Sequence, residues 1–132
     1  MEMTGILVDT NIYVAFKRNQ QRAVDLLRRA EYIGISTIVL GELLAGFRCG
    51  TREKENRDEL ELFLDAPRVN ILSVDETTAE FYAGVYRTLR QKGRPIPTND
   101  LWLAASAMRH GLALATQDEH FSQIDGLLLV PL

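Results

Sequence analysis

The chain has 132 residues, of which 46% are hydrophobic and 25% are charged. This balance is typical of a soluble globular protein and excludes a disordered or fibrous one. The length predicts a single domain over residues 1–132. Because Cys49 is the only cysteine, an internal disulfide and a zinc site built from several thiolates are both excluded.

The charge and the N-terminus bear on location and partners. The apolar stretches are too short and too interrupted to cross a bilayer, and Glu2 stands where a signal peptide carries a basic region. We therefore expect a cytoplasmic protein without a membrane partner. The formal net charge of −3 opposes broad adhesion to nucleic acid. If a metal ion occupied four acids, the remainder would be −3 + 4 = +1, which leaves an RNA partner open.

The first third of the chain predicts two strands, each followed by a helix. Residues 6–8 form a short aliphatic run that reads as a buried strand, and Asp9 directly after it is a good helix cap. Apolar residues recur at helical spacing over 23–30, and residues 35–37 then predict a second strand. The apolar stripe over 40–47 predicts the helix that follows.

The middle of the chain continues this alternation. The charge-rich segment 51–65 predicts a surface helix, which Pro67 closes. Residues 69–74 predict a third strand. Asp75 then caps a long helix that runs to Lys92, because apolar residues line one face of that segment.

The last segments complete the predicted fold. Pro97 forces an extended approach to a helix that starts near residues 98–100 and ends before Gly111. Residues 112–115 and 127–130 predict strands four and five. Since apolar strands alternate with helices, we expect an α/β fold with three layers, in which helices cover both faces of a mostly parallel five-stranded sheet.

Three acids are isolated in uncharged surroundings. Asp9 is the only charged residue over 3–16, Glu42 over 33–47, and Asp100 over 95–108. A carboxylate in an apolar environment is costly unless it is hydrogen-bonded, paired, protonated or bound to a metal. Asp118, which follows the predicted fourth strand, is the fourth candidate.

Each acid also has a purely structural interpretation. Asp9 and Asp100 can stabilise helix N-termini. Thr116 and Glu119 have the spacing of a capping box, which would make Asp118 part of an ordinary turn. Glu42 is the hardest to explain in this way, because small residues surround it on its side of the helix and leave space for an ion or a substrate.

Topology favours one shared site for the four acids. Suppose that strands one to three are added to the sheet in one direction and strands four and five in the other. A crevice then opens beyond the C-terminal ends of strands one and four. Asp9 and Asp118 follow those strands, and Glu42 and Asp100 lie on helices beside them. Four carboxylates about 5 Å apart repel by roughly 3 kcal/mol per pair at an effective dielectric of about 20. Oxygen ligands suit Mg²⁺ or Mn²⁺, which activate water and stabilise charge on phosphoryl oxygens.

Four segments resemble the motifs of PIN-domain nucleases, and most closely those of VapC toxins. These are residues 5–11, 36–47, 97–100 and 115–121, in this order over nearly the whole chain. The resemblance implies an endoribonuclease dependent on Mg²⁺ or Mn²⁺, whose catalytic and metal-binding residues are Asp9, Glu42, Asp100 and Asp118. It further implies that Thr10, Asn11, Asn99 and Thr116 orient these acids or water. It also implies a homodimer, held inactive by a VapB-like antitoxin whose C-terminal segment fills the groove.

Other polar and aromatic residues give weaker indications. Trp102 can stack on a base or pack in the core. His110 stands at an expected helix C-terminus, and His120 has no partner that suggests zinc. Basic residues that could rim the site and hold phosphates, or serve only as solvated surface charge, are Arg48, Arg52, Lys54, Arg90, Lys92 and Arg94.

Three other functions remain open from the sequence. A phosphatase could use Asp9 as a nucleophile, but position 11, where a second Asp is usual, is Asn. A signalling receiver domain that binds Mg²⁺ would need an acidic pair at strand one and a late lysine, and no lysine follows Lys92. A non-catalytic PIN-like binding protein would not need the full set of acids. Cleavage of labelled RNA with and without EDTA, beside a phosphatase assay, separates these functions.

Overall fold

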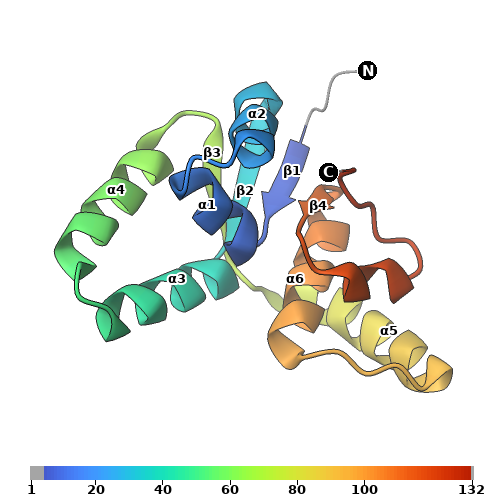
Figure 1. Ribbon diagram of the computed structural model, residues 1–132. Helices are drawn as coiled ribbons and strands as arrows, with labels where there is room; N and C mark the ends of the chain where they lie inside the picture. Colours follow the sequence, from blue (N-terminus) through green and yellow to red (C-terminus); the bar gives the residue numbers. More distant parts are fainter. Residues whose placement is uncertain (1–4, 132) are drawn as a thin grey trace.

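Strands alternate with helices along residues 5–131, the part of the chain that the computed structural model describes (Figure 1). The elements are β1 (Gly5–Val8), α1 (Thr10–Lys17), α2 (Gln21–Arg29), β2 (Tyr32–Ser36), α3 (Thr37–Cys49), α4 (Glu53–Asp65), β3 (Val69–Leu72), α5 (Glu76–Lys92), α6 (Thr98–His110), β4 (Ala113–Ala115) and a 3₁₀ helix, η1 (Glu119–Gln123). These bounds agree with the predicted elements to within a few residues.

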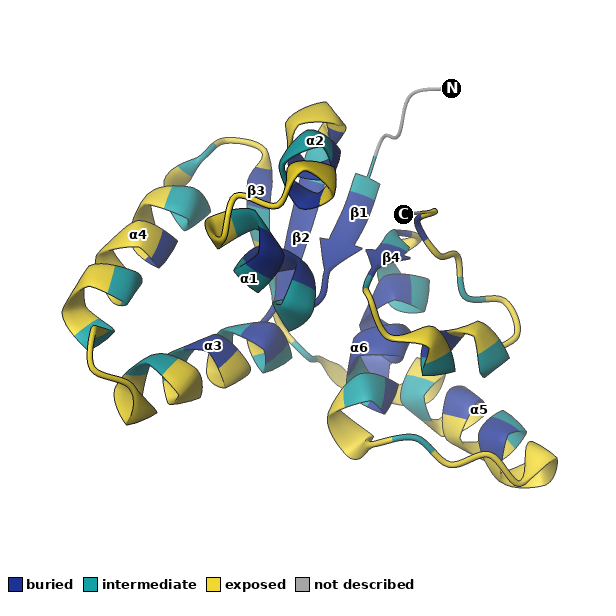
Figure 2. Ribbon diagram, viewed as in Figure 1, coloured by how far each residue is buried: buried dark blue, intermediate teal, exposed yellow. Residues whose placement is uncertain are grey.

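The sheet is parallel, and its central strands are buried. Its strand order is β3-β2-β1-β4, and β1 pairs in parallel with both β2 and β4. Ile6, Leu7 and Val8 of β1 are all fully buried. Because successive side chains of a strand point to opposite faces, this burial requires cover on both faces of the sheet (Figure 2). The predicted α/β architecture is thereby confirmed.

The predicted fifth strand is wrong. Residues 127–130 meet the sheet at one bridge, between Leu129 and Leu114. The ladder cannot extend backwards, because the N–H of Leu112 already donates to the carbonyl of Ala107 at the end of α6 (2.9 Å) and Gly126 turns the chain at a φ of 84°. Within the described residues the sheet therefore has four strands.

The helices lie in pairs around the sheet. Figure 1 shows α3 and α4 as a hairpin on one side of the molecule, and α5 packed beside α6 on the other. Asp75 accepts a hydrogen bond from the N–H of Thr78 (2.9 Å), which confirms it as the cap of α5. Trp102 stacks on Tyr82, with ring centroids 4.1 Å apart, so its ring packs between α5 and α6. No helix in the described part of the chain has the length and hydrophobicity needed to cross a membrane.

The ends of β1 and β4 determine the position of the candidate site. The strand order reverses between these two neighbours, as the sequence predicts, and both strands run in the same direction. Their carboxyl ends therefore open on the same edge of the sheet. The N–H of Asp9 donates to the carbonyl of Ala115 (2.9 Å), which ties the first residue after β1 to the last residue of β4.

Candidate active site

Asp9 lies at the bottom of the site. It directly follows β1, caps α1 and is only 5% exposed. Its carboxylate accepts hydrogen bonds from the N–H of Thr10 and from the hydroxyl of Thr116, each at 2.7 Å. Burial raises the pKa of Asp9, and the nearby charges of Asp100 and Asp118 add to the rise, whereas these two hydrogen bonds act in the opposite direction. Asp9 is therefore a helix cap, as one interpretation predicted, and also a carboxylate whose charge is poorly compensated.

Glu42 reaches the site from α3. One carboxylate oxygen accepts a hydrogen bond from the hydroxyl of Thr10 (2.6 Å), and the other lies 3.5 Å from the amide nitrogen of Asn99. A side chain added at Gly41 or Gly46 would meet no neighbour within 4 Å. The surface around Glu42 is therefore open, as its small neighbours indicate, and a ligand can approach the carboxylate.

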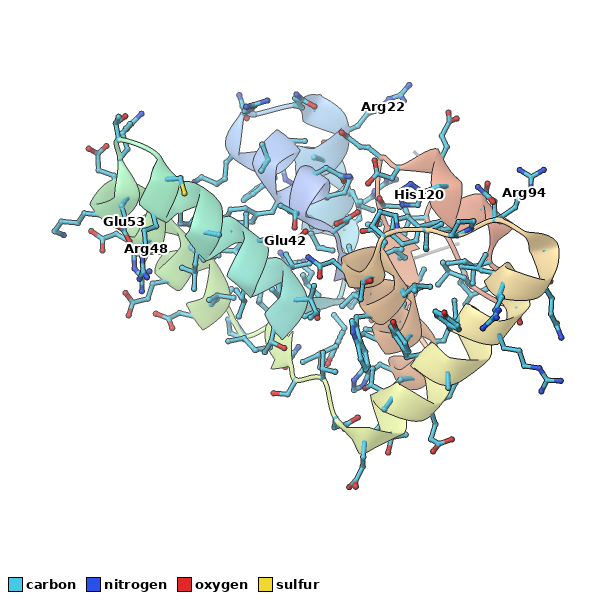
Figure 3. All side chains as sticks on the ribbon, turned by 90° about the horizontal axis from the view of Figure 1, so that it is seen from below. Arg22, Glu42, Arg48, Glu53, Arg94 and His120 are labelled. Atoms are coloured by element: carbon cyan, nitrogen blue, oxygen red, sulfur yellow. The ribbon has the colours of Figure 1, made fainter. Side chains whose placement is uncertain are left out.

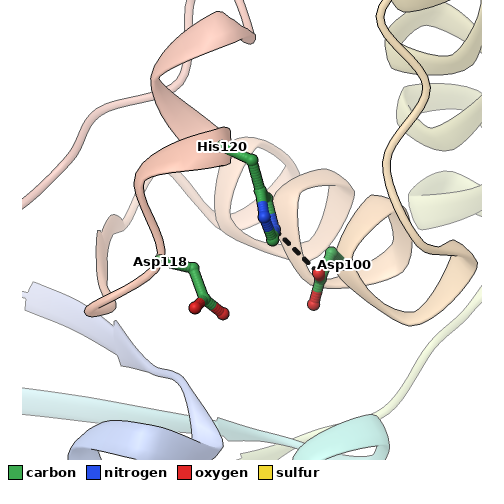
Figure 4. A group of neighbouring side chains, drawn as sticks. All are labelled: Asp100, Asp118 and His120. Carbon is green, nitrogen blue, oxygen red and sulfur yellow. Dashed lines mark ion pairs between the residues drawn. The ribbon is translucent and has the colours of Figure 1, made fainter.

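Asp100 and Asp118 complete the set of acids. Asp100 lies in the first turn of α6, and Asp118 immediately precedes η1. Burial raises the pKa of Asp100; His120 beside it lowers that pKa, and the charges of Asp118 and Glu42 raise it. The ligand atoms of Asp100, Asp118 and His120 all lie within 4.8 Å of one another (Figure 4).

Short polar side chains connect these acids. The hydroxyl of Thr116 donates to Asp9 and accepts a hydrogen bond from the N–H of Asp118 (3.1 Å). The amide nitrogen of Asn11 lies 3.4 Å from both Asp9 and Asp118. The capping-box interpretation of Thr116 is therefore wrong, since its hydroxyl is used within the cluster of acids and η1 has no side-chain cap. All four residues expected to orient the acids, Thr10, Asn11, Asn99 and Thr116, contact at least one of them.

One cleft of about 460 Å³ joins the four acids. It is lined by Asp9, Thr10, Asn11, Val14, Ala15, Arg18, Gln20, Glu42, Asp100, Gln117 and Asp118. In the described part of the chain, none of the six basic residues proposed from the sequence lines it. Figure 3 shows Glu42 and His120 in the central region of the molecule, while Arg48 and Arg94 lie at opposite ends. Several of these basic residues form surface ion pairs, such as Arg48 with Glu53 (3.5 Å) and Lys92 with Asp125 (2.8 Å).

Two residues of this region, Arg18 and His120, are not among the site residues expected from the sequence. Arg18 follows α1 and lines the cleft. Its position could have been anticipated, because it lies seven residues after Asn11, about two helical turns, and therefore on the same face of α1. His120 lies beside one of the predicted acids: its Nε2 is 2.8 Å from a carboxylate oxygen of Asp100. Only the folded turn after Asp118 places the imidazole there.

The donor set fits a hard divalent cation. Four carboxylates around one cleft offer oxygen ligands, and the raised pKa values of Asp9 and Asp100 indicate that their negative charge lacks sufficient compensation from the protein. Asp9, Glu42, Asp100 and Asp118 are the residues that would hold such ions around the cleft, although among the described residues only Asp100 and Asp118, together with His120, have ligand atoms within 4.8 Å of one another. When bound, Mg²⁺ or Mn²⁺ activates water and stabilises charge on phosphoryl oxygens.

Comparisons with known proteins agree with this fold. The family model of the PIN domain matches residues 6–127. Ribonuclease VapC4 of Mycobacterium tuberculosis is 31% identical over 123 residues, which cover 92% of each chain. The crystal structure of VapBC2 from Rickettsia felis, bound to a DNA fragment from their promoter, contains a chain that superposes with a TM-score of 0.85 at 29% identity, over 96% of this chain and 97% of that one. FitAcB of Neisseria gonorrhoeae gives a TM-score of 0.80 at 30% identity, over 96% and 97%. The protein belongs to the PIN domain family.

Proposed function

We propose that the protein is a metal-dependent endoribonuclease that hydrolyses RNA phosphodiester bonds, and that it is the toxin of a VapBC-like toxin–antitoxin pair. The observation that carries this proposal is the convergence of Asp9, Glu42, Asp100 and Asp118 on one cleft. The match to a relative named as a ribonuclease, over 92% of both chains, supports RNA as the substrate. This role places the protein in the cytoplasm, where its substrate is.

The charges of the cleft explain why a metal ion is needed. A phosphodiester is an anion, so four carboxylates would repel it unless a cation lies between them. We assign Mg²⁺ or Mn²⁺ to Asp9, Glu42, Asp100 and Asp118. Thr10, Asn11, Asn99 and Thr116 hold these acids by hydrogen bonds and fix the directions of their lone pairs. Arg18, at the rim of the same cleft, is placed to attract a phosphate of the RNA.

Two substitutions test the proposal. Asp9→Asn and Asp100→Asn should each abolish metal-dependent cleavage of a labelled RNA, because each removes a charged ligand while preserving the shape of the side chain. Asp58→Asn is a matched control: Asp58 is exposed on α4 and pairs only with Lys54 in the described part of the chain (2.9 Å). This control should cleave RNA like the unaltered protein, and EDTA should stop its cleavage.

Circular dichroism shows whether each variant is folded, and a phosphatase assay runs on the same samples. Unchanged RNA cleavage by both folded variants would falsify the proposal. Hydrolysis of a phosphate monoester without cleavage of RNA would favour the phosphatase instead.

The proposal extends to protein partners. The R. felis structure is of VapBC2, bound to a DNA fragment from their promoter. By analogy we propose that a VapB-like antitoxin binds this chain, with its C-terminal segment in the acidic cleft, and that the chain forms a homodimer. Light scattering of the purified protein tests the dimer, since a monomeric mass at micromolar concentration contradicts it. RNA cleavage that continues in the presence of a tightly bound antitoxin would contradict occupation of the cleft.

A further inference from the structure

One nitrogen atom of the site has no hydrogen bond. Nε2 of His120 is buried, and within residues 5–131 no group forms a hydrogen bond with it. It lies 2.8 Å from a carboxylate oxygen of Asp100, but the geometry of this contact is not that of a hydrogen bond. Buried polar atoms in proteins are nearly always satisfied, so this nitrogen is available to a further partner, and the side chain, 32% exposed, can be reached from outside. The neighbouring Phe121 ring, 4.7 Å away between centroids, helps to fix the imidazole.

The spacing of the surrounding donors is compatible with a cation bound beside this nitrogen. Figure 4 shows the side chains of Asp100, Asp118 and His120 pointing toward one another, and their ligand atoms all lie within 4.8 Å of each other. An octahedral ion with bonds of about 2.1 Å holds adjacent ligands about 3.0 Å apart and opposite ligands about 4.2 Å apart. The three donors are therefore spaced so that one ion can bind them after small side-chain movements.

We propose that His120 is a nitrogen ligand of a divalent ion shared with Asp100 and Asp118, and that it gives the site a preference for Mn²⁺ over Mg²⁺. This inference rests on the proposed metal-dependent function, and it adds a ligand to the carboxylates. Mg²⁺ strongly prefers oxygen donors and keeps several waters. Imidazole nitrogen favours first-row transition metals, of which Mn²⁺ also accepts carboxylates readily.

A purely electrostatic role for His120 makes a different prediction. If the imidazole only paired with Asp100, it would stay outside the coordination shell of the ion. Its removal would then weaken the binding of Mn²⁺ and Mg²⁺ to a similar extent. Direct coordination predicts a selective loss, because only Mn²⁺ gains from the nitrogen donor.

Electron spin echo envelope modulation of bound Mn²⁺ distinguishes these roles, because it detects a directly coordinated nitrogen nucleus. The samples are the full chain, His120→Gln, His120→Asn and the matched control His110→Gln. His110 lies at the opposite end of α6 from Asp100 and, unlike His120, does not belong to the group of ligand atoms around Asp100 and Asp118. We expect the nitrogen coupling in the unaltered protein and in the control, and its loss in both His120 variants.

Calorimetry with Mn²⁺ alone and with Mg²⁺ alone gives a second measurement. The His120 variants should bind Mn²⁺ about tenfold or more weakly, whereas their affinity for Mg²⁺ should change much less. Measuring two substitutions protects the test from a folding defect in one of them.

Three results would overturn the proposal: no binding of Mn²⁺, Mn²⁺ bound to the unaltered protein without a nitrogen coupling, or equal losses of affinity for the two ions. A failure of the ribonuclease proposal has another signature, namely an Mn²⁺-loaded protein that shows the nitrogen coupling and cleaves no RNA.

Discussion

Replacing Asp118 by Asn should stabilise the metal-free protein. A carboxylate oxygen of Asp118 lies within 4.8 Å of one of Asp100, and the two negative charges repel each other when no cation lies between them. The amide has the same shape, and its oxygen can still accept the hydrogen bond that Asn11 donates to Asp118 (3.4 Å). The substitution therefore removes mainly the charge.

The distance sets the size of the effect. At 4.8 Å, two unit charges repel by about 3.5 kcal/mol at an effective dielectric of about 20, and by about 0.9 kcal/mol in bulk water. Asp118 is exposed, whereas the side chain of Asp100 is only 18% exposed, and His120 offsets part of its charge. We therefore expect the free energy of unfolding to increase by about 1 kcal/mol, close to the value for bulk water. This increase corresponds to a rise in Tm of about 3 to 5 °C for a domain of this size.

Thermal unfolding in EDTA measures this gain. Asp125→Asn is the matched control, because it changes the net charge equally but removes an exposed ion pair with Lys92 (2.8 Å). Such pairs contribute about 0 to 1 kcal/mol, so the control should have an unchanged or lower Tm. Saturating Mn²⁺ should reverse the order of Asp118→Asn and the unaltered protein, because the latter binds the ion more tightly. An unchanged or lower Tm of Asp118→Asn in EDTA would refute the crowding of these carboxylates.

Two further predictions concern pH and RNA binding. The pKa values of Asp9 and Asp100 lie above the usual 3.8 in the folded protein, so their contribution to stability is present below about that pH and is lost as the pH rises through the raised values. Urea unfolding in EDTA should show that stability falls as the pH rises above about 4, and Asp9→Asn should reduce this fall. An equal fall in both proteins would argue against the raised pKa of Asp9. Arg18→Ala should weaken the binding of a labelled single-stranded RNA, measured in the cleavage-deficient Asp100→Asn background. Because one phosphate contact disappears, the slope of the logarithm of the binding constant against the logarithm of the salt concentration should decrease in magnitude by about 0.7. Arg94→Ala should leave that slope unchanged, and equal slopes for the two variants would remove Arg18 from the RNA-binding surface.

The acids of the cleft could be identified from the sequence because their signal is local. Asp9, Glu42 and Asp100 each stand alone in an uncharged stretch, and an isolated charge among apolar residues requires a physical explanation. Their convergence needed one additional rule, that parallel strands on either side of a reversal in strand order open a crevice at their carboxyl ends. That rule places Asp9 and Asp118 at the same edge without any knowledge of side-chain contacts.

The features that the sequence could not provide depend on hydrogen bonds and single turns. The imidazole of His120 meets Asp100 because η1 is a 3₁₀ turn, and so short a turn leaves no periodic pattern of apolar residues. Hydrophobicity predicted a fifth strand over 127–130, but it carries no information about the N–H of Leu112, which α6 already uses. The break between α1 and α2 depends similarly on Asn19, a single residue with a φ of 59°.

The order of the ligands along the chain has a consequence for biosynthesis. Asp9 and Glu42 belong to the segment from β1 to α3, whereas Asp100 and Asp118 belong to α6 and to the turn after β4. A nascent polypeptide thus carries at most two of the four carboxylates until residue 100 has been added, and β1 lacks its neighbour β4 until residues 113–115 have been added. The four acids can therefore gather around one cleft only after α6, β4 and the turn that follows β4 have been synthesised and have folded against β1.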